Sequence, residues 1–136
     1  MNVLLVGGGA REQAIAEALA KSKPMPNIFA WMKKTLNPGI AELADKVMIG
    51  YTYYDALSLA GQLKPDLAII GPEEPLYIGL ADSLESLNIP TVGPRQRLAR
   101  IETSKSIARM LMKKYDIPGS PKLEVFMDMN GIEKYL

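Results

Sequence analysis

Five short apolar runs, separated by segments with helical spacing, are the feature that most constrains the fold of this chain. The runs lie at Val3–Val6, Ile28–Met32, Lys46–Ile49, Leu67–Ile70 and Thr91–Val92. They are too short for helices, and runs of mainly apolar residues are typical of strands buried on both faces of a sheet. Strands that alternate with helices favour right-handed crossovers between parallel strands. The sequence therefore predicts a doubly wound α/β domain with a parallel five-stranded sheet and helices on both faces.

Four helices are predicted from apolar spacing and capping signals. They are expected at Arg11–Lys21, Thr52–Leu63, Ile78–Leu87 and Ile101–Tyr115. Thr52 and Asp55 have the spacing of a capping box, and Asn88 is suited to a left-handed turn after the third of these helices.

The last part of the chain is expected to lie outside this domain. Two prolines and a glycine at residues 118–121 interrupt the helical pattern and predict a linker. We expect an N-terminal domain of residues 1–117, followed by residues 118–136 with a candidate strand at Lys122–Phe126 and the start of a helix. Because that helical pattern is incomplete at Leu136, we expect the sequence to be part of a longer protein.

The residue composition excludes several kinds of chemistry. The chain has no Cys and no His, which rules out disulfides, thiolate nucleophiles, Ser-His-Asp triads and metal sites built from those residues. Sixteen Lys and Arg against fifteen Asp and Glu give a net charge of +1, so no overall field favours nucleic acid or an anionic membrane. No apolar run approaches the roughly 18 residues of a membrane span. We therefore expect a cytoplasmic protein with neither nucleic acid nor membrane as a partner.

A run of three glycines follows the first predicted strand. Gly7, Gly8 and Gly9 precede the helix expected from Arg11. Glycines let a backbone approach an anion closely, and unpaired N–H groups at a helix start point toward it. The pattern predicts a phosphate-binding loop, with a tight strand-to-helix turn as the alternative. If the loop binds phosphate, Gly9→Val is expected to abolish binding with little effect on the fold.

The same glycines begin a dinucleotide-binding pattern that the following residues do not complete. Glu12 stands where the third glycine of G-x-G-x-x-G belongs, and the second strand ends in Lys33 and Lys34 where an acidic residue is expected. Either lysine could bind a 2′-phosphate, so an NADP-binding domain of an oxidoreductase is an alternative. A third hypothesis is a non-catalytic binding module, because the fold alone does not fix the function.

Two further loops follow predicted strands at the edge where doubly wound sheets bind ligands. Asn37, Pro38 and Gly39 form a turn that could offer an amide to a ligand. Glu73 and Glu74 lie between two prolines and could bind sugar hydroxyls, an amine or Mg²⁺. Solvated acids in a rigid turn are the alternative for this pair.

Several motifs, taken in their order along the chain, resemble one enzyme family. They are GGGAREQAIAEAL from Gly7, NPGI from Asn37, GPEEPLYIGLAD from Gly71, VGP from Val92 and IETSKSIARMLMKKYDIP from Ile101. This combination resembles the N-terminal domain of phosphoribosylamine-glycine ligases over residues 1–121, with GPEEPL and IETSK as its specific parts. The resemblance implies a Rossmann-like domain that precedes an ATP-grasp region.

The resemblance also implies an activity for the whole ligase. In that family, ATP phosphorylates the carboxylate of glycine, and the amine of 5-phosphoribosylamine attacks the glycyl phosphate to give glycinamide ribonucleotide, ADP and phosphate. This domain would bind phosphoribosylamine, whereas ATP and Mg²⁺ would be bound mainly by a region that begins past Leu136. We therefore expect these 136 residues alone to be catalytically inert, with no catalytic or metal-binding residue of their own.

Binding roles for individual residues follow from the same resemblance. The sugar phosphate is expected to meet Gly8, Gly9, Ala10 and Arg11. The ribose and its amine are expected to meet Asn37, Pro38, Gly39, Glu73, Pro75 and Leu76. Lys105 is expected to face ATP.

Two positions depart from the usual family loop, GGREH. Ala10 replaces its last glycine and Gln13 its histidine. An alanine with negative φ can still offer its N–H to a phosphate. Gln13 can form hydrogen bonds but cannot be protonated, which puts any role of a positive charge at this position in doubt.

Overall fold

The computed structural model describes residues 1–119, 121–122, 124–126 and 128–135. Its residues group into two units, Met1–Ala99 and Arg100–Leu136, and each is described by itself. The first unit contains the sheet and every predicted substrate-binding residue, whereas Lys105 belongs to the second. The domain boundary expected after residue 117 stays a prediction.

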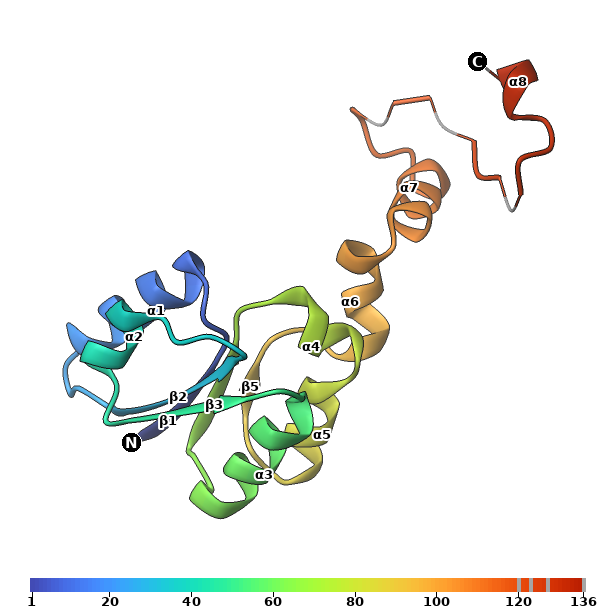
Figure 1. Cartoon of the computed structure of the whole chain (residues 1–136). Helices are drawn as coiled ribbons and strands as arrows, with labels where there is room; N and C mark the ends of the chain where they lie inside the picture. The colour runs from blue at the N-terminus through green and yellow to red at the C-terminus, as the bar shows by residue number, and fades with distance from the viewer. Residues whose placement is uncertain (120, 123, 127, 136) are drawn as a thin grey trace. The chain divides into compact units, whose positions relative to one another are not determined.

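Five parallel strands form one sheet in the order β3-β2-β1-β4-β5 (Figure 1). They are β1 (Asn2–Val6), β2 (Asn27–Lys33), β3 (Lys46–Gly50), β4 (Leu67–Ile70) and β5 (Thr91–Val92), which confirms the predicted sheet. Val6 pairs with Trp31 of β2 and with Ile70 of β4, so the loops after these strands leave the sheet at one edge. The strand order reverses between β1 and β4, where sheets of this kind bind ligands.

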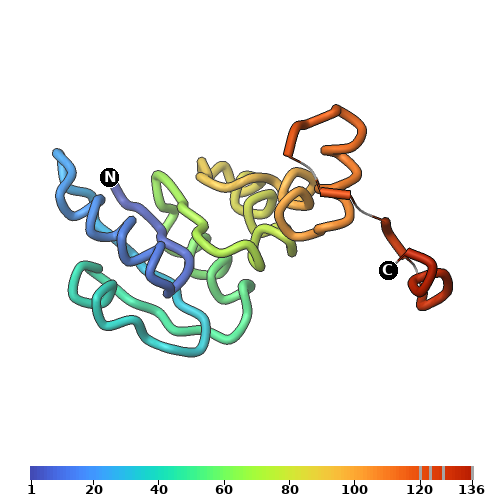
Figure 2. The backbone as a smooth tube through the Cα atoms, turned by 90° about the horizontal axis from the view of Figure 1, so that it is seen from above, coloured from blue at the N-terminus to red at the C-terminus, as the bar shows by residue number. Residues whose placement is uncertain are grey.

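Helices cover both faces of the sheet, as predicted. The helices of the described ranges are α1 (Ala10–Ala20), α2 (Pro38–Leu43), α3 (Tyr53–Leu63), α4 (Glu73–Tyr77), α5 (Leu80–Ser86), α6 (Gln96–Thr103), α7 (Lys105–Lys114) and α8 (Ile132–Tyr135), of which α1 to α5 pack on the sheet. Leu5 of β1 packs with Ala16 of α1 and Ile40 of α2, two helices that lie side by side (Figure 2). Leu4 and Val6 point to the opposite face and pack with α3, α4 and α5. None of the helices in the described ranges has the length and apolar character needed to cross a membrane.

Two short helices are absent from the sequence-based expectations. α2 follows Asn37, whose side chain caps it, and α4 begins at Glu73 in a segment expected to be a rigid turn. Each contains fewer than two helical turns, so neither produces a repeating apolar pattern in the sequence.

The prediction of a single long helix at Ile101–Tyr115 is wrong, because the structure has two helices there, α6 and α7, with a break at Ser104. The Ser104 hydroxyl accepts a hydrogen bond from the N–H of Ile107 at 3.4 Å and so caps α7. The predicted strand at residues 122–126 is also wrong for the residues that the structure describes there, since Lys122 and Glu124–Phe126 are not in a strand. Residue 123 lies outside the described residues. The expected final helix is present as α8.

Candidate functional site

Three loops meet at the carboxyl edge of the sheet beside β1 and β4, and we call this region the switch-point edge. It comprises Gly7–Arg11, Asn37–Gly39 and Gly71–Leu76. Nδ2 of Asn37 donates a hydrogen bond to the carbonyl oxygen of Gly8 at 3.1 Å, which joins the first loop to the second. Nη2 of Arg11 lies 3.5 Å from Oε2 of Glu73, which joins the first loop to the third. The structure therefore brings together the substrate-binding residues predicted on all three loops.

The first loop places the start of α1 at this edge. Gly9 is the N-cap of α1, and its N–H donates a hydrogen bond to Oε2 of Glu12 at 2.6 Å. This N–H is therefore already used, whereas the first-turn N–H groups of Ala10 and Arg11 have no partner within the helix. Ala10 keeps a negative φ, so its N–H stays available. Both groups lie at the positive end of the helix dipole, where a phosphate is stabilised.

The side chain of Asn37 fixes the second loop in place. Its Oδ1 accepts hydrogen bonds from the N–H of Gly39 at 2.9 Å and of Ile40 at 3.3 Å, while its Nδ2 donates to Gly8. Pro38 has no N–H to offer. Asn37 thus uses both ends of its amide to hold α2 and the first loop together.

Gln13, which replaces the histidine of the family loop, lies against the second loop. A Cβ added to Gly39 would be 2.6 Å from the Cδ of Gln13, so the two residues are in close contact. Nε2 of Gln13 donates a hydrogen bond to Glu17 at 3.2 Å. These contacts place the Gln13 side chain between α1 and α2.

The two neighbouring carboxylates of the third loop have different partners. Glu74 accepts a hydrogen bond from Nζ of Lys33 at 2.6 Å and one from the hydroxyl of Tyr53 at 2.9 Å. The hydrogen bonds from Lys33 and then Tyr53 lower the pKa of Glu74. Burial, followed by the bond to Glu74, raises the pKa of the Tyr53 hydroxyl. Both oxygens of Glu74 are therefore engaged within the protein.

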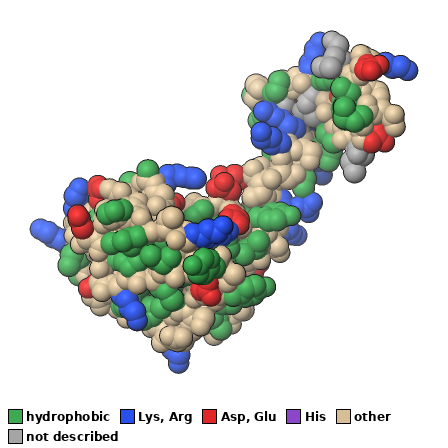
Figure 3. Space-filling model, in the orientation of Figure 1, with side chains coloured by type: hydrophobic (Ala, Val, Ile, Leu, Met, Phe, Trp, Pro, Cys, Tyr) green, Lys and Arg blue, Asp and Glu red, His purple; other side chains and the backbone are tan. Residues whose placement is uncertain are grey.

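Both carboxylates are exposed, Glu74 by 57%, but the ion pair of Glu73 is the longer one, with Arg11 at 3.5 Å. The side chain of Glu73 is 53% exposed, and that of Arg11 is 69% exposed. An exposed pair of this kind contributes at most about 1 kcal/mol, so a ligand can replace it at small cost. Guanidinium groups bind phosphate well, and carboxylates accept hydrogen bonds from hydroxyl and amine groups. Acidic and basic side chains adjoin on this side of the first unit (Figure 3), which suits a ligand with one anionic and one donor end.

Two of the predicted binding residues are buried. Pro75 is among the fully buried side chains, and Leu76 is only 5% exposed and packs in the core between β4 and α5. Their side chains hold α4 against the sheet. Any contact that they make with a ligand would use their backbone.

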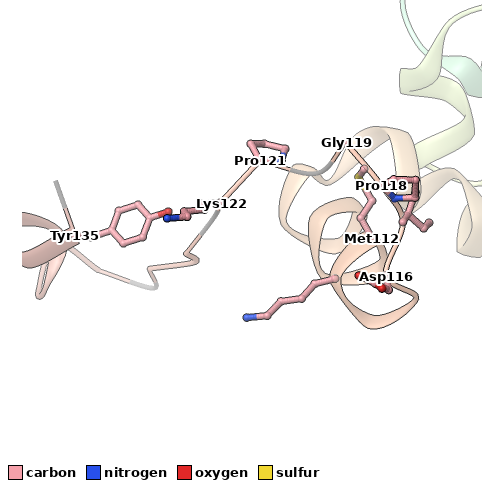
Figure 4. Close-up of a pocket in the computed structure, with 9 residues that line it drawn as sticks. Met112, Asp116, Pro118, Gly119, Pro121, Lys122 and Tyr135 are labelled. Atoms are coloured by element: carbon pink, nitrogen blue, oxygen red, sulfur yellow. The ribbon is translucent and has the colours of Figure 1, made fainter.

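The second unit contains the residue expected to face ATP. Lys105 is the exposed first residue of α7, and its role toward ATP stays a prediction. An open pocket of about 580 Å³ in this unit is lined by residues that include Met112, Asp116 and Tyr135 (Figure 4). It contains none of the predicted site residues. Nowhere in the described ranges do three acidic side chains gather as a candidate metal site.

Three side chains shape the edge through contacts that the sequence patterns did not predict. Glu12 has the capping-box spacing from Gly9, a local signal that could have identified its role. Lys33 and Tyr53 reach Glu74 from distant segments, and no local pattern predicts such contacts. The NADP alternative loses support, because Lys33 is already paired and Glu12 occupies the position of the third glycine.

Solved structures with a similar fold belong to carboxylating and ligating enzymes. N5-carboxyaminoimidazole ribonucleotide synthetase from Thermotoga maritima has a TM-score of 0.72 at 16% identity, covering 98% of this chain and 36% of that one. The biotin carboxylase subunit of pyruvate carboxylase has a TM-score of 0.65 at 19% identity, covering 94% and 31%. At these identities the similarity establishes the fold, and it confirms the doubly wound α/β prediction.

The chain is also similar in sequence to proteins named phosphoribosylamine–glycine ligase. The relative from Methanococcoides burtonii is 46% identical over 139 residues, which cover 100% of this chain and 32% of the relative. The relative from Methanocaldococcus jannaschii is 47% identical over 128 residues, which cover 93% and 28%. The chain thus spans 28% to 32% of the length of these relatives.

The family described as "Phosphoribosylglycinamide synthetase, N domain" matches residues 1–102. This match covers most of the chain and includes all three loops of the switch-point edge. It confirms the resemblance that the motifs indicated. The chain therefore belongs to the phosphoribosylglycinamide synthetase N-domain family.

Proposed function

We propose that this chain binds 5-phosphoribosylamine as the N-terminal domain of an ATP-dependent phosphoribosylamine–glycine ligase of purine biosynthesis. The whole ligase would join glycine to phosphoribosylamine through a glycyl phosphate, with ATP converted to ADP and phosphate. Membership of the N-domain family and relatives named for this activity support the proposal.

The proposal depends on one observation, the pairing of Arg11 with Glu73 beside the start of α1. In the proposed complex, the phosphate of the ligand accepts hydrogen bonds from the N–H of Ala10 and from the Arg11 guanidinium. Glu73 accepts hydrogen bonds from a ribose hydroxyl or the amine. A ligand with a phosphate and a hydroxyl or amine gives both Arg11 and Glu73 a new partner when it separates them. Inorganic phosphate gives a new partner to Arg11 alone.

The domain would then act by positioning. A ligand held at both ends keeps its amine in a fixed orientation, and this lowers the entropic cost of the attack on glycyl phosphate. Asn37 fixes the first loop through Gly8, and Lys33 and Tyr53 fix Glu74 in the third. The ligand therefore meets loops whose positions are already set.

ATP and Mg²⁺ belong to the proposed ligase as a whole. We propose that both bind mainly outside these residues, since the chain spans only 32% of the length of a relative named for this activity. Lys105 would contribute one cation to the nucleotide phosphates. Glycine and phosphoribosylamine would be the small-molecule partners, and the protein would act in the cytoplasm with neither nucleic acid nor membrane as a partner.

Calorimetric titration of the 136-residue chain tests this proposal. Ribose 5-phosphate keeps the phosphate and hydroxyls of phosphoribosylamine, and we expect it to bind more tightly than inorganic phosphate or ribose. NADPH is expected not to bind. Affinity for NADPH without affinity for ribose 5-phosphate would instead support the oxidoreductase alternative. No binding of any of these ligands would support the non-catalytic module.

A further inference from the structure

The switch-point edge encloses a buried carboxylate that no predicted role explains. Glu12, the third residue of α1, is only 3% exposed and is the buried charged residue of the described core. Ion pairs between described residues involve Arg11, Lys33 and Arg95, and none of them uses Glu12. Burying a carboxylate without a cation is costly unless hydrogen bonds and dipoles compensate. Here the N–H of Gly9, at 2.6 Å, and the positive end of α1 provide that compensation.

Glycines from two loops surround this carboxylate. A Cβ added to Gly7 would lie 2.7 Å from Cγ of Glu12, and one added to Gly9 would lie 2.8 Å from its Oε2. A Cβ added to Gly71, in the loop after β4, would overlap Oε1 of Glu12. Glu12 is enclosed on these sides, so its side chain cannot swing away into solvent. These three glycines therefore make room for Glu12.

Gly8 is different from its neighbours. The nearest atoms to a Cβ added there belong to Met32, at 3.4 Å, which is an ordinary contact. Two of the three glycines in the first loop are thus explained by the side chain of Glu12, without any requirement for the close approach of a phosphate.

The position of Glu12 is electrostatically unfavourable for an anion site. A negative charge in the first turn of α1 opposes the binding of a phosphate at the same helix end. A carboxylate retained there must therefore provide something other than charge. What it provides is geometry, because Glu12 contacts the first loop at Gly7 and Gly9 and the third loop at Gly71.

We propose that Glu12 is the positioning residue of the switch-point edge, which fixes the spacing between the anion-binding N–H groups of α1 and the acceptor Glu73 on α4. This inference rests on the proposed function, because the spacing matters for a ligand that binds both loops. Glu12 touches no ligand itself. It acts through the Gly9 N–H and through the backbone at Gly71.

Binding measurements on two variants separate geometry from charge. Glu12→Gln keeps the size of the side chain and an oxygen that accepts from the Gly9 N–H, so ribose 5-phosphate affinity should stay within about threefold of the unaltered chain. Glu12→Ala removes the contacts of Glu12 with the first and third loops and should lower that affinity at least about tenfold, and affinity for inorganic phosphate by less. Higher affinity in both variants would show that the charge only opposes the anion and would overturn the proposal. Equal affinity in Glu12→Ala and the unaltered chain would also overturn it.

A second experiment needs no ligand and stays informative if Glu12→Ala is less stable. Gly71 does not have a left-handed φ, so alanine is sterically allowed there by the backbone itself. Gly71→Ala should lower the urea midpoint when Glu12 is present and change it little in the Glu12→Ala background, a coupling of at least about tenfold in the unfolding constant. Gly61→Ala in α3, where nothing lies within 4 Å of an added Cβ, is the matched control and should show no coupling. Equal effects of Gly71→Ala in both backgrounds would overturn the link between the loops.

The two experiments also separate this inference from the proposed function. If the unaltered chain binds no ribose 5-phosphate, the proposed function fails and the positioning role fails with it, whatever the coupling. If the unaltered chain binds but the coupling is absent, the positioning role alone is overturned.

Discussion

Arg11 and Glu73 are joined across the point where the strand order reverses, with Nη2 of Arg11 3.5 Å from Oε2 of Glu73. Arg11 is the second residue of α1, and Glu73 is the first residue of α4. The pair thus connects the helices that begin beyond the ends of neighbouring strands. Because both side chains are more than half exposed, the pair adds little stability, and it lies where a doubly wound sheet binds its ligand.

Replacing Arg11 should therefore affect binding far more than folding. We expect Arg11→Met to lower ribose 5-phosphate affinity at least about tenfold, because a charged hydrogen bond to phosphate contributes about 1.5–3 kcal/mol. The free energy of unfolding should change by less than about 1 kcal/mol. Calorimetry and urea unfolding measure the two effects. Arg97→Met, at an exposed arginine of α6, is the control, and an equal loss of affinity in both variants would contradict the role of Arg11.

The neighbouring carboxylates Glu73 and Glu74 should respond differently to the same substitution. Glu73→Gln is expected to weaken ribose 5-phosphate binding more than inorganic phosphate binding, because in the proposed complex Glu73 accepts hydrogen bonds from the sugar end of the ligand. Glu74→Gln is expected to lower the melting temperature, because Lys33 and Tyr53 lose their charged acceptor. Each variant serves as the control for the other. Identical binding and melting profiles for the two would refute the division of roles.

The lowered pKa of Glu74 predicts how the free energy of unfolding depends on pH. Its pKa in the folded chain lies below the ordinary value of 4.5, chiefly because of Lys33, so its contribution is present above that value. The contribution is lost as the pH falls through the lowered pKa. Asp55 behaves in the same way, since the N–H groups of Thr52 and Tyr51 lower its pKa from 3.8. Urea midpoints measured at decreasing pH should therefore fall, and the fall should be smaller in Glu74→Gln. An unchanged acid profile in that variant would exclude Glu74 as a source of this dependence.

Much of the fold could be predicted because the sheet dominates the sequence pattern. Strands buried on both faces require uninterrupted apolar runs, and these runs are visible without knowledge of their partners. The expected capping box at Thr52 and Asp55 is present, with the Thr52 N–H donating to Asp55 at 2.9 Å. α2 and α4 were not predicted, because each has fewer than two helical turns and so gives no repeating apolar pattern. The break at Ser104 was not predicted, because the apolar spacing continues across it while the Ser104 hydroxyl caps a new helix.

The site was predictable only as far as topology determines it. Parallel strands end at one edge, so the glycine loop, the Asn37 turn and the Glu73 segment had to meet there. Which carboxylate has both oxygens bound within the protein depends on Lys33 and Tyr53, and folding brings these two residues to Glu74 from distant segments. For the same reason, the burial of Glu12 against Gly71 could not be predicted from neighbouring residues, whereas its capping-box spacing from Gly9 could.

These 136 residues alone should not perform the ligase reaction. If ATP and Mg²⁺ bind mainly outside these residues, as proposed, no glycyl phosphate should form for the amine to attack. A phosphate-release assay with ATP, glycine and phosphoribosylamine should give the rate of the buffer control. Release above that rate, absent in Arg11→Met, would contradict the proposal that the chain contributes binding only.

The glycines of the first loop allow the last test, since they differ in what a side chain would meet. Sequence alone favours Gly9→Val as a change that removes binding and spares the fold. In the structure, a Cβ at Gly9 would lie 2.8 Å from the buried Glu12 carboxylate, so this variant should lose about 1–3 kcal/mol of unfolding free energy as well as affinity. In Gly8→Ala the added Cβ meets only Met32, at an ordinary distance, so this variant should keep its unfolding free energy. Urea unfolding and calorimetry on the two variants decide the matter: a Gly9→Val protein as stable as the unaltered chain would mean that the loop accommodates a side chain without disturbing Glu12.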